Sequence, residues 1–498
     1  MNRRQFLHRG MSACALALGT GSALADIATY QQFHAALAKQ PSLSVVADTV
    51  GSLSGTARVE GRLPRDLQGV FFRNGPGRFE LGGERYHHWF DGDGFAQRWQ
   101  IRDGKVNHLG KFVTTQKFVA EQKAGQFLYP TFGTHITRAG VKNNDTINAA
   151  NTNLLPFEGR LYALWEGGSA TEVDPETLET RGLTTWRDDL KSMPFSAHPK
   201  VAADGSLWNF GALPGRDQLA LYHLKRDGTV ANFGVVVIPN LAMVHDFVIS
   251  AAHLIFLVAP FDVKPDPNRS FLDMHRWTGT GPQAQPMRVV VVAKADLQIR
   301  QVFELPPRMN FHLGNAFDDG NTTRFDAVLH EGDPLRELGS LMRGELQKND
   351  PKSASTVQIT LDYSSKKATE ARLFGVSEFP RVMPHVVGAR HHRLAVLGTS
   401  PGSKDAILNA VHLLNTDSGK ADSYHFDAGW QVEEHVLVPR PNARSETDDY
   451  LLGVAQHIAK RETVLTVFDA ARISAGPVAL AHLPYRAPHC FHGNFLSV

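Results

Sequence analysis

Four histidines spread along the chain lie in short segments of shared character. Each has apolar or aromatic neighbours that would seat the imidazole inside a folded structure; the four are His198, His245, His312 and His492. Neutral imidazole is a good ligand for divalent iron, and four such ligands leave coordination positions open for oxygen. A lone histidine beside aromatic residues is more often a hydrogen-bonded core residue, and the chain has 23 histidines. The residues alone therefore support a histidine-rich metal site without fixing its members.

Three glutamates lie in apolar surroundings, where a free charge would be costly. They are Glu166, directly after an Ala-Leu-Trp sequence, Glu378, just before Phe-Pro, and Glu434, close to a Val-Leu-Val run. A histidine that binds a metal usually donates its second ring N–H to an acceptor, often a carboxylate. Each glutamate could orient one ligand in this way, and each taken alone could equally be an exposed residue at the end of a strand.

The first 25 residues have the features of an export signal. The sequence Arg3-Arg4-Gln5-Phe6-Leu7 is followed by small and weakly apolar residues that end in Ala23-Leu24-Ala25. This order is typical of a signal peptide, and the paired arginines resemble the twin-arginine export signal. We expect residues 1–25 to be removed, residues 26–498 to form one domain, and the protein to reach the bacterial periplasm. The apolar run is shorter than the roughly 20 residues that a membrane-spanning helix needs.

Cysteine usage and net charge narrow the choice of chemistry. Of the two cysteines, Cys14 lies in the expected signal, so the mature chain would keep only Cys490. An intramolecular disulfide and a zinc–thiolate site are then excluded, and any metal needs nitrogen or oxygen ligands. The net charge of +2 gives no electrostatic argument for nucleic acid or an anionic membrane as partner. A metabolic enzyme or a binding protein fits better.

From about residue 54 onward, the sequence predicts short strands separated by turns. Stretches rich in β-branched and aromatic residues predict strands at 160–165, 254–258, 288–292, 357–361 and 463–468. Turn signals between such stretches lie at 102–105, 226–229 and 417–419. Helices are expected at 27–40 and 335–347. So many short strands predict a propeller or a pair of sandwiches, and no repeat of fixed period chooses between these folds.

Three further motifs combine small, aromatic and charged residues. They are Phe72-Arg73-Asn74-Gly75-Pro76, Trp89-Phe90-Asp91-Gly92-Asp93-Gly94 and Ala163-Leu164-Trp165-Glu166-Gly167-Gly168. Together with the four histidine segments they resemble, in order, the motifs of the carotenoid cleavage oxygenases, a family that includes apocarotenoid and lignostilbene dioxygenases. The resemblance runs from residue 72 to residue 495. Gly77-Arg78 and Leu313-Gly314 depart from the family pattern, and neither departure removes a histidine.

The resemblance implies an all-β, seven-bladed β-propeller with a cap of loops and helices over an iron site. One Fe(II) per chain would be bound by the four histidines named above, and the three glutamates would orient three of them. Thr152 matches a threonine near an open metal position in some members. His489 lies outside the Phe-His-Gly match, and we interpret it as a bystander.

The activity implied is cleavage of a conjugated carbon–carbon double bond with O2, giving two carbonyl products. The substrate would be a hydrophobic conjugated molecule, and the 29 phenylalanines could line a tunnel for it. We favour an apocarotenoid, because the segment 163–168 looks more like that branch of the family. Stilbene-cleaving members use a tyrosine and a lysine to activate a phenol, and the sequence does not place such a pair. A phenolic stilbene or a phenylpropanoid is the alternative.

Two readings from other classes stay open. One is a secreted propeller without catalytic activity that binds a ligand, and the other is a zinc- or copper-dependent hydrolase or oxidase that uses the same histidines. Metal content and oxygen dependence discriminate between them. By analogy with the family a peripheral membrane contact is expected, although no stretch of the sequence demonstrates it, and no oligomeric state follows from the sequence.

Overall fold

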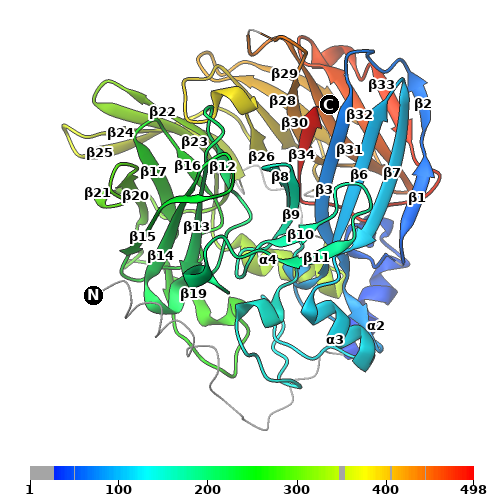
Figure 1. Ribbon diagram of the computed structural model, residues 1–498, viewed down its shortest axis with the longest axis horizontal. Helices are drawn as coiled ribbons and strands as arrows, with labels where there is room; N and C mark the ends of the chain where they lie inside the picture. Colours follow the sequence, from blue (N-terminus) through cyan, green and yellow to red (C-terminus); the bar gives the residue numbers. More distant parts are fainter. Residues whose placement is uncertain (1–26, 50, 347–353, 404–406, 444, 498) are drawn as a thin grey trace.

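The computed structural model describes residues 27–49, 51–346, 354–403, 407–443 and 445–497. Residues 1–25, which we predict to be an export signal, lie outside the described residues, so that assignment stays a prediction. Seven antiparallel sheets of four or five strands stand around a common axis (Figure 1). The expected all-β, seven-bladed propeller is confirmed.

Each blade has one strand next to the axis. From blade 1 to blade 7, these inner strands are β34 (His492–Ser497), β8 (Asn153–Phe157), β12 (Lys200–Val201), β16 (Phe247–Ile249), β22 (Met309–Asp319), β26 (Ser377–Arg381) and β30 (Trp430–Pro439). Most neighbouring inner strands contact one another; β34, for example, contacts β8 on one side and β30 on the other. The inner strands therefore bring distant parts of the chain together at the axis.

The other strands of each blade follow outward. Blade 1 continues with β3 (Gly69–Arg78), β6 (Asp93–Arg102), β7 (Lys105–Phe112) and β1 (Leu53–Thr56). Blade 2 continues with β9 (Arg160–Leu164), β10 (Thr171–Val173) and β11 (Thr180–Leu183). Blade 3 continues with β13 (Leu207–Leu213), β14 (Gln218–Leu224) and β15 (Val230–Val237). Blades 4 and 5 continue with β17 (His253–Val258), β20 (Met287–Ala293) and β21 (Ile299–Leu305), and with β23 (Thr322–His330), β24 (Ala354–Asp362) and β25 (Lys367–Arg372). Blades 6 and 7 continue with β27 (Arg393–Gly398), β28 (Ala410–Asn415) and β29 (Ala421–His425), and with β31 (Asp449–His457), β32 (Glu462–Asp469), β33 (Ala479–His482) and β2 (Arg58–Gly61).

The strands predicted from continuous apolar runs are confirmed, and their burial explains the pattern. Successive side chains of a strand point to opposite faces, and in a propeller both faces of a blade are covered by its neighbours. In β17, Leu254 and Phe256 pack toward blade 3, while Ile255 and Leu257 pack toward blade 5. Both faces need apolar residues, so the run does not alternate with polar ones. The three predicted turns join β6 to β7, β14 to β15 and β28 to β29.

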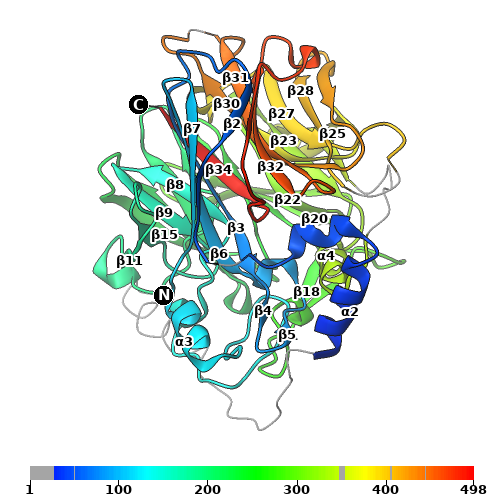
Figure 2. The ribbon, with the colours of Figure 1, turned by 90° about the vertical axis from the view of Figure 1, so that its right-hand side faces the viewer.

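A cap covers one end of the propeller (Figure 2). It contains the helices α2 (Ile27–Leu37), α3 (Gln116–Ala124) and α4 (Pro334–Ser340), and the small sheets of β4 (Glu80–Leu81) with β5 (Glu84–Arg85) and β18 (Phe261–Val263) with β19 (His275–Trp277). Short 3-10 helices lie at Pro41–Val46, Trp89–Asp91, Asn144–Ile147, Asp188–Leu190, Pro214–Arg216, Leu272–Met274, Leu341–Arg343, Pro384–Val386 and Ile473–Ala475. None of the helices among the described residues is long and apolar enough to cross a lipid bilayer.

The two expected helices are present but shorter than predicted. The first ends at Leu37 and gives way to the 3-10 helix, and the second passes into a 3-10 helix that ends before Gly344. Gly344 has a φ of +87°, a left-handed conformation that stops a helix. The sequence interpretation missed α3. Its signals were Thr115, whose side chain caps the helix by accepting from the N–H of Phe118 at 3.2 Å, and Gly125, which follows its last turn.

Strands from opposite ends of the chain close the ring twice. The C-terminal β34 pairs with β3 in blade 1, and the N-terminal β2 pairs with β33 in blade 7. Between these two blades lies a buried ion pair, in which Arg73 Nη2 of β3 contacts Glu433 Oε2 of β30 at 3.1 Å. The same guanidinium donates to the carbonyl oxygens of Glu434 at 2.7 Å and Cys490 at 3.3 Å. Arg73 therefore ties the first blade to the last.

Replacing Arg73 with methionine should destabilise the closed ring, because the Glu433 carboxylate would stay buried without its cation. We expect the free energy of unfolding, measured in urea, to fall by about 3–5 kcal/mol. Adding Glu433→Gln should restore part of that loss, since it removes the unpaired charge. An Arg73→Met variant as stable as the wild type would show that this ion pair does not hold the closure.

Candidate metal centre

The four histidines that are far apart in sequence meet at the axis of the propeller. Their ligand atoms all lie within 4.8 Å of one another, and all four residues are buried. The Nε2 atom of His198 is 3.0 Å from that of His245, which is 3.2 Å from that of His312. The Nε2 atoms of His312 and His492 are also 3.2 Å apart. No other group of three or more potential metal ligands occurs in the described part of the chain.

The histidines and the glutamates of the site come from different blades. Blades 1, 3, 4 and 5 each supply one histidine, at or within two residues of β34, β12 and β16, and inside β22. The remaining blades supply the three glutamates: Glu166 follows β9 of blade 2, Glu378 lies in β26 of blade 6, and Glu434 lies in β30 of blade 7. The four blades that supply histidines and the three that supply glutamates together make up the whole propeller.

Each glutamate accepts from the Nδ1 atom of one histidine. Glu166 pairs with His245, Glu378 Oε2 lies 2.5 Å from His312, and Glu434 Oε1 lies 2.9 Å from His492, in three contacts that leave each Nε2 facing the axis. Burial by itself raises the pKa of Glu378, but His312 and His330 together outweigh it and the net shift is downward. The carboxylate is therefore ionised and can only accept, so the ring N–H must be on Nδ1.

His198 has no glutamate partner. Its Nδ1 atom is 4.0 Å from Asp246 Oδ1, and that oxygen contacts Lys200 Nζ at 2.8 Å. Asp246 also accepts from the backbone N–H of Leu313 at 2.8 Å, which links blade 4 to blade 5 beside His312. Leu313 belongs to one of the two departures from the family pattern, and its backbone contributes to the site.

The electrostatics favour a neutral imidazole at His198 and His492, but not at His245. Burial lowers the pKa of His198 well below its ordinary value, and the neighbouring rings add to that shift. Burial also lowers the pKa of His492 to about 4, against the opposing pull of Glu434. Burial opposes a charge on His245 as well, but Glu166 outweighs it and raises the pKa. Neutral imidazoles expose a lone pair, which is the form that binds a metal.

The donor set fits a divalent metal. When these rings are neutral, Nδ1–H donation by His245, His312 and His492 leaves an unprotonated Nε2 on each of them. The Nε2 atoms of neighbouring rings lie 3.0 to 3.2 Å apart, so a cation between them would be attracted by each unprotonated nitrogen. Four buried imidazoles with carboxylates behind three of them could therefore bind a metal.

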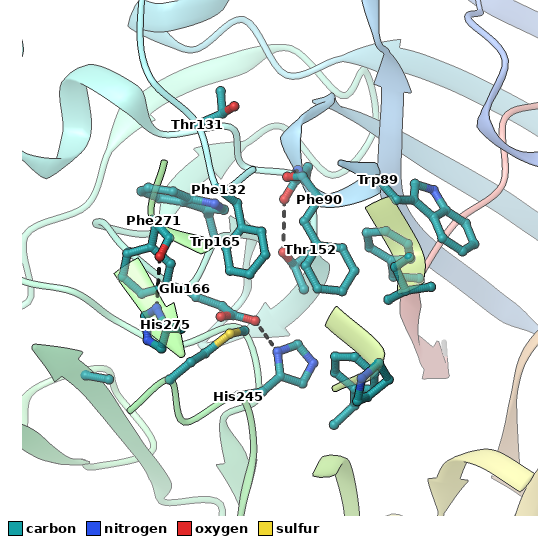
Figure 3. A pocket seen from close by; sticks show the side chains of 18 of the residues that line it. Trp89, Phe90, Thr131, Phe132, Thr152, Trp165, Glu166, His245, Phe271 and His275 are labelled. Carbon is teal, nitrogen blue, oxygen red and sulfur yellow. Dashed lines mark hydrogen bonds and ion pairs between the residues drawn. The ribbon is translucent and has the colours of Figure 1, made fainter. Parts of the chain in front are cut away.

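A large apolar cavity opens onto the cluster. Its volume is about 1520 Å³, and aromatic side chains form much of its wall, including Trp89, Phe90, Phe132, Trp165, Phe271, Phe311, Phe379 and Phe491. Figure 3 shows the Glu166–His245 pair at the edge of this space, with Thr152 and Phe90 beside it. Thr152 also lines the cavity. It directly precedes β8, the inner strand of blade 2, in the sequence. His489 also lines the cavity but is not in the cluster; its ring lies 5.5 Å from that of Trp89.

Two residues near the site were not found from the sequence. His330, at the end of β23, donates from Nε2 to Glu378 Oε1 at 2.7 Å, so Glu378 is shared by His330 and His312. Asn151 accepts a hydrogen bond from the Thr152 hydroxyl at 3.0 Å. Asn151 is adjacent to Thr152 in the sequence and could have been considered, whereas nothing in the sequence around His330 points to the cluster.

Comparison with known proteins places the chain in a family. The family model described as retinal pigment epithelial membrane protein matches residues 48–497, which is most of the chain. The chain belongs to this family, that of the carotenoid cleavage oxygenases. The resemblance stated from the motifs is thereby confirmed.

Relatives in the family carry several activities. The chain is 30% identical to the apocarotenoid-15,15'-oxygenase of Synechocystis, over 88% of this chain and 92% of the relative. It is 26% identical to the isoeugenol monooxygenase of Pseudomonas nitroreducens, over 87% and 93%, and 27% identical to lignostilbene-alpha,beta-dioxygenase isozyme III of Sphingomonas paucimobilis, over 88% and 92%. The crystal structure of the cobalt-substituted Synechocystis apocarotenoid oxygenase superposes with a TM-score of 0.83 and 26% identity, covering 92% of this chain and 99% of that one.

Replacing Glu378 with glutamine should weaken metal binding. A glutamine carbonyl can accept from only one of His312 and His330, and its amide N–H would oppose the other ring N–H. We expect the affinity for Co(II), measured by competition with a chelator, to fall about 10- to 100-fold. Glu172→Gln, at a glutamate in the outer part of blade 2, is the control and should bind like the wild type. An unchanged affinity in Glu378→Gln would contradict the orienting role of this carboxylate.

Proposed function

We propose that the protein is a non-heme Fe(II) dioxygenase that cleaves a conjugated carbon–carbon double bond with O2 and forms two carbonyl products. One observation carries the proposal: four buried imidazole Nε2 atoms converge where a large apolar cavity meets the propeller axis. The relatives named above, which include carotenoid, stilbene and isoeugenol oxygenases, support it. A protein that only bound an apolar ligand would not need four converging imidazole nitrogens.

The four histidines would hold one Fe(II) per chain. Iron held by neutral nitrogen ligands supplies the activation of O2. The cobalt-substituted structure of the Synechocystis relative supports a divalent metal in this fold. All-nitrogen ligation also speaks against a zinc hydrolase, in which a carboxylate or cysteine ligand is common.

The protein's own residues then bind the substrate and keep water away. The cavity wall around the cluster is aromatic and aliphatic, which suits a planar conjugated chain. The ring of Phe90 lies 6.5 Å from that of His245 at an angle of 7°, and the ring of Phe379 lies 4.9 Å from that of His312 at an angle of 28°. These rings would hold the double bond beside the metal and exclude solvent from the reacting carbons.

The lining favours an apocarotenoid over a phenolic stilbene. Activation of a phenol in stilbene-cleaving members depends on a tyrosine and a lysine, and the described residues that line the cavity include neither type. A polyene needs no such pair, because it has no phenolic proton to remove. The likeness to isoeugenol and lignostilbene oxygenases keeps a phenylpropanoid or stilbene as the second candidate.

The iron-loaded protein should cleave an apocarotenal and release two carbonyl fragments, detected by chromatography with mass spectrometry. Because the cavity lacks the phenol-activating residue types, we expect kcat/KM for a hydroxystilbene to be lower by at least about tenfold. Removal of the metal by a chelator should abolish cleavage, and Fe(II) should restore it.

The His245→Ala variant tests the ligand assignment in the same assay. It should lose both bound iron and activity, whereas His489→Ala should keep its iron, since His489 lies outside the cluster. A His245→Ala protein with full iron and full activity would contradict the assignment. Preference for the hydroxystilbene would leave the metal site standing and reverse the choice of substrate.

We propose in addition that the protein is exported by the twin-arginine route. That route carries folded proteins, which suits a site that exists only once the ring has closed. Changing Arg3 and Arg4 to lysines should leave the protein in the cytoplasm, as measured by cell fractionation and immunoblotting. The same change at Arg58 and Arg62 is the control and should not affect export. Unchanged periplasmic protein in the Arg3 and Arg4 variant would overturn the assignment.

A further inference from the structure

Two motifs that carried the family resemblance lie outside the histidine cluster. The first, at residues 72–76, belongs to β3, and the second, at residues 89–94, runs into β6 of the same blade. Strands β3 and β6 are paired with Pro76 opposite Gly94, so the two motifs form one unit. Both lie against the turn at residues 149–153, which contains Thr152.

The first motif holds this turn through one amide side chain. Asn74 is fully buried, and its Nδ2 donates to the carbonyl oxygens of Ala150 at 2.8 Å and Asn153 at 3.3 Å. In the β3–β34 pairing, the backbone of Asn74 lies opposite His492. A single buried residue therefore connects a metal-facing histidine of blade 1 to both flanks of Thr152.

The second motif holds the turn by hydrogen bonds and by close approach. Asn151 Nδ2 donates to the carbonyl oxygens of Phe90 at 2.9 Å and Gly92 at 2.7 Å, and the N–H of Gly94 donates to Ala149 at 2.9 Å. A Cβ atom on Gly94 would lie 2.1 Å from the carbonyl oxygen of Ala150. Only glycine at this position lets the turn come so near β6.

The turn itself is in an unfavourable conformation. Ala150 has a φ of +45°, in the left-handed region that a residue with a Cβ atom seldom adopts. Such a conformation persists only where the surroundings over-determine it, and it is concentrated at functional sites. The bonds from Asn74 and Gly94 supply that constraint.

The consequence reaches the side chain of Thr152. Its hydroxyl donates to Asn151 Oδ1 at 3.0 Å (Figure 3). Its backbone N–H donates to the carbonyl oxygen of Leu164 at 3.0 Å. Because the hydroxyl proton is used in that bond, Thr152 acts by occupying a fixed place rather than by donating a proton. In the order of the blades this place lies between His492 and His198, in blade 2, which supplies no ligand.

We propose that the two motifs form a seat for the turn at residues 149–153, and that Asn74 and Gly94 are positioning residues that fix Thr152 beside the metal. The proposal rests on the proposed iron site for its catalytic meaning, although the seat itself can be tested without metal. By fixing Thr152, the seat sets how much room substrate and O2 have in the gap between His492 and His198.

The first test uses the metal-free protein and hydrogen exchange. Asn74→Ala removes both bonds to the turn, and Asn315→Ala is the matched control, because Asn315 is a buried amide that donates to Val386 at 2.8 Å and Ala389 at 2.9 Å elsewhere in the ring. Exchange of the amides at 149–153 should become roughly tenfold faster in Asn74→Ala and stay at the wild-type rate in Asn315→Ala. Gly94→Ala, which displaces the turn by steric contact, should act like Asn74→Ala if the latter fails to fold.

The second test uses the cobalt-loaded protein and a double-variant cycle. Thr152→Ala and Asn74→Ala should each change the visible absorption of bound Co(II), while Asn315→Ala should not. If Asn74 acts through Thr152, the double variant should show the spectrum of Thr152→Ala with no added change. Additive spectral changes, or unchanged exchange at 149–153, would overturn the proposal. A wild-type protein that binds no cobalt would instead contradict the iron site and leave the exchange test of the seat intact.

Discussion

The convergence of four imidazole nitrogens at the axis is the constraint on which the rest of the structure depends. The nearest Nε2 atoms are 3.0 to 3.2 Å apart, close enough for one cation to contact all four rings. The four rings belong to blades 1, 3, 4 and 5, and His492 is in the strand that closes the circle. The site therefore does not exist in any fragment of the chain, and forms only when the last strand has joined the first blade.

The arrangement of the blades explains how the four imidazole rings are held at this spacing. The three blades without a ligand histidine carry the glutamates, and each glutamate contacts the ligand of another blade. The groups that orient the imidazoles therefore come from the whole ring of blades. The pairing of β34 with β3 and of β2 with β33 closes that ring. Arg73 joins blade 1 to blade 7 and at the same time contacts the backbone of Glu434, the partner of His492. Stability of the closure and geometry of the metal centre are coupled through these few buried groups.

Much of the fold could be predicted from the sequence, because local patterns determine strands and turns. The apolar runs at 254–258 and 288–292 give strands that are buried on both faces, and the Asp-Gly turns join neighbours within a blade. The members of the histidine cluster could not be chosen by spacing, since the ring brings together residues far apart in sequence; they came from the resemblance. His330 escaped attention because its contact with Glu378 joins segments 48 residues apart, and no local pattern encodes it. The helix α3 was missed although Thr115 and Gly125 mark its ends.

The most direct test of the account is the X-ray absorption spectrum of the iron-loaded, full-length protein at the iron K-edge. Multiple scattering from imidazole rings reports how many histidines bind the metal. We predict a single iron environment with four imidazole ligands and no sulfur or protein carboxylate in the first coordination sphere. A spectrum that requires fewer than four imidazoles, or a carboxylate ligand from the surrounding glutamates, would contradict the central claim.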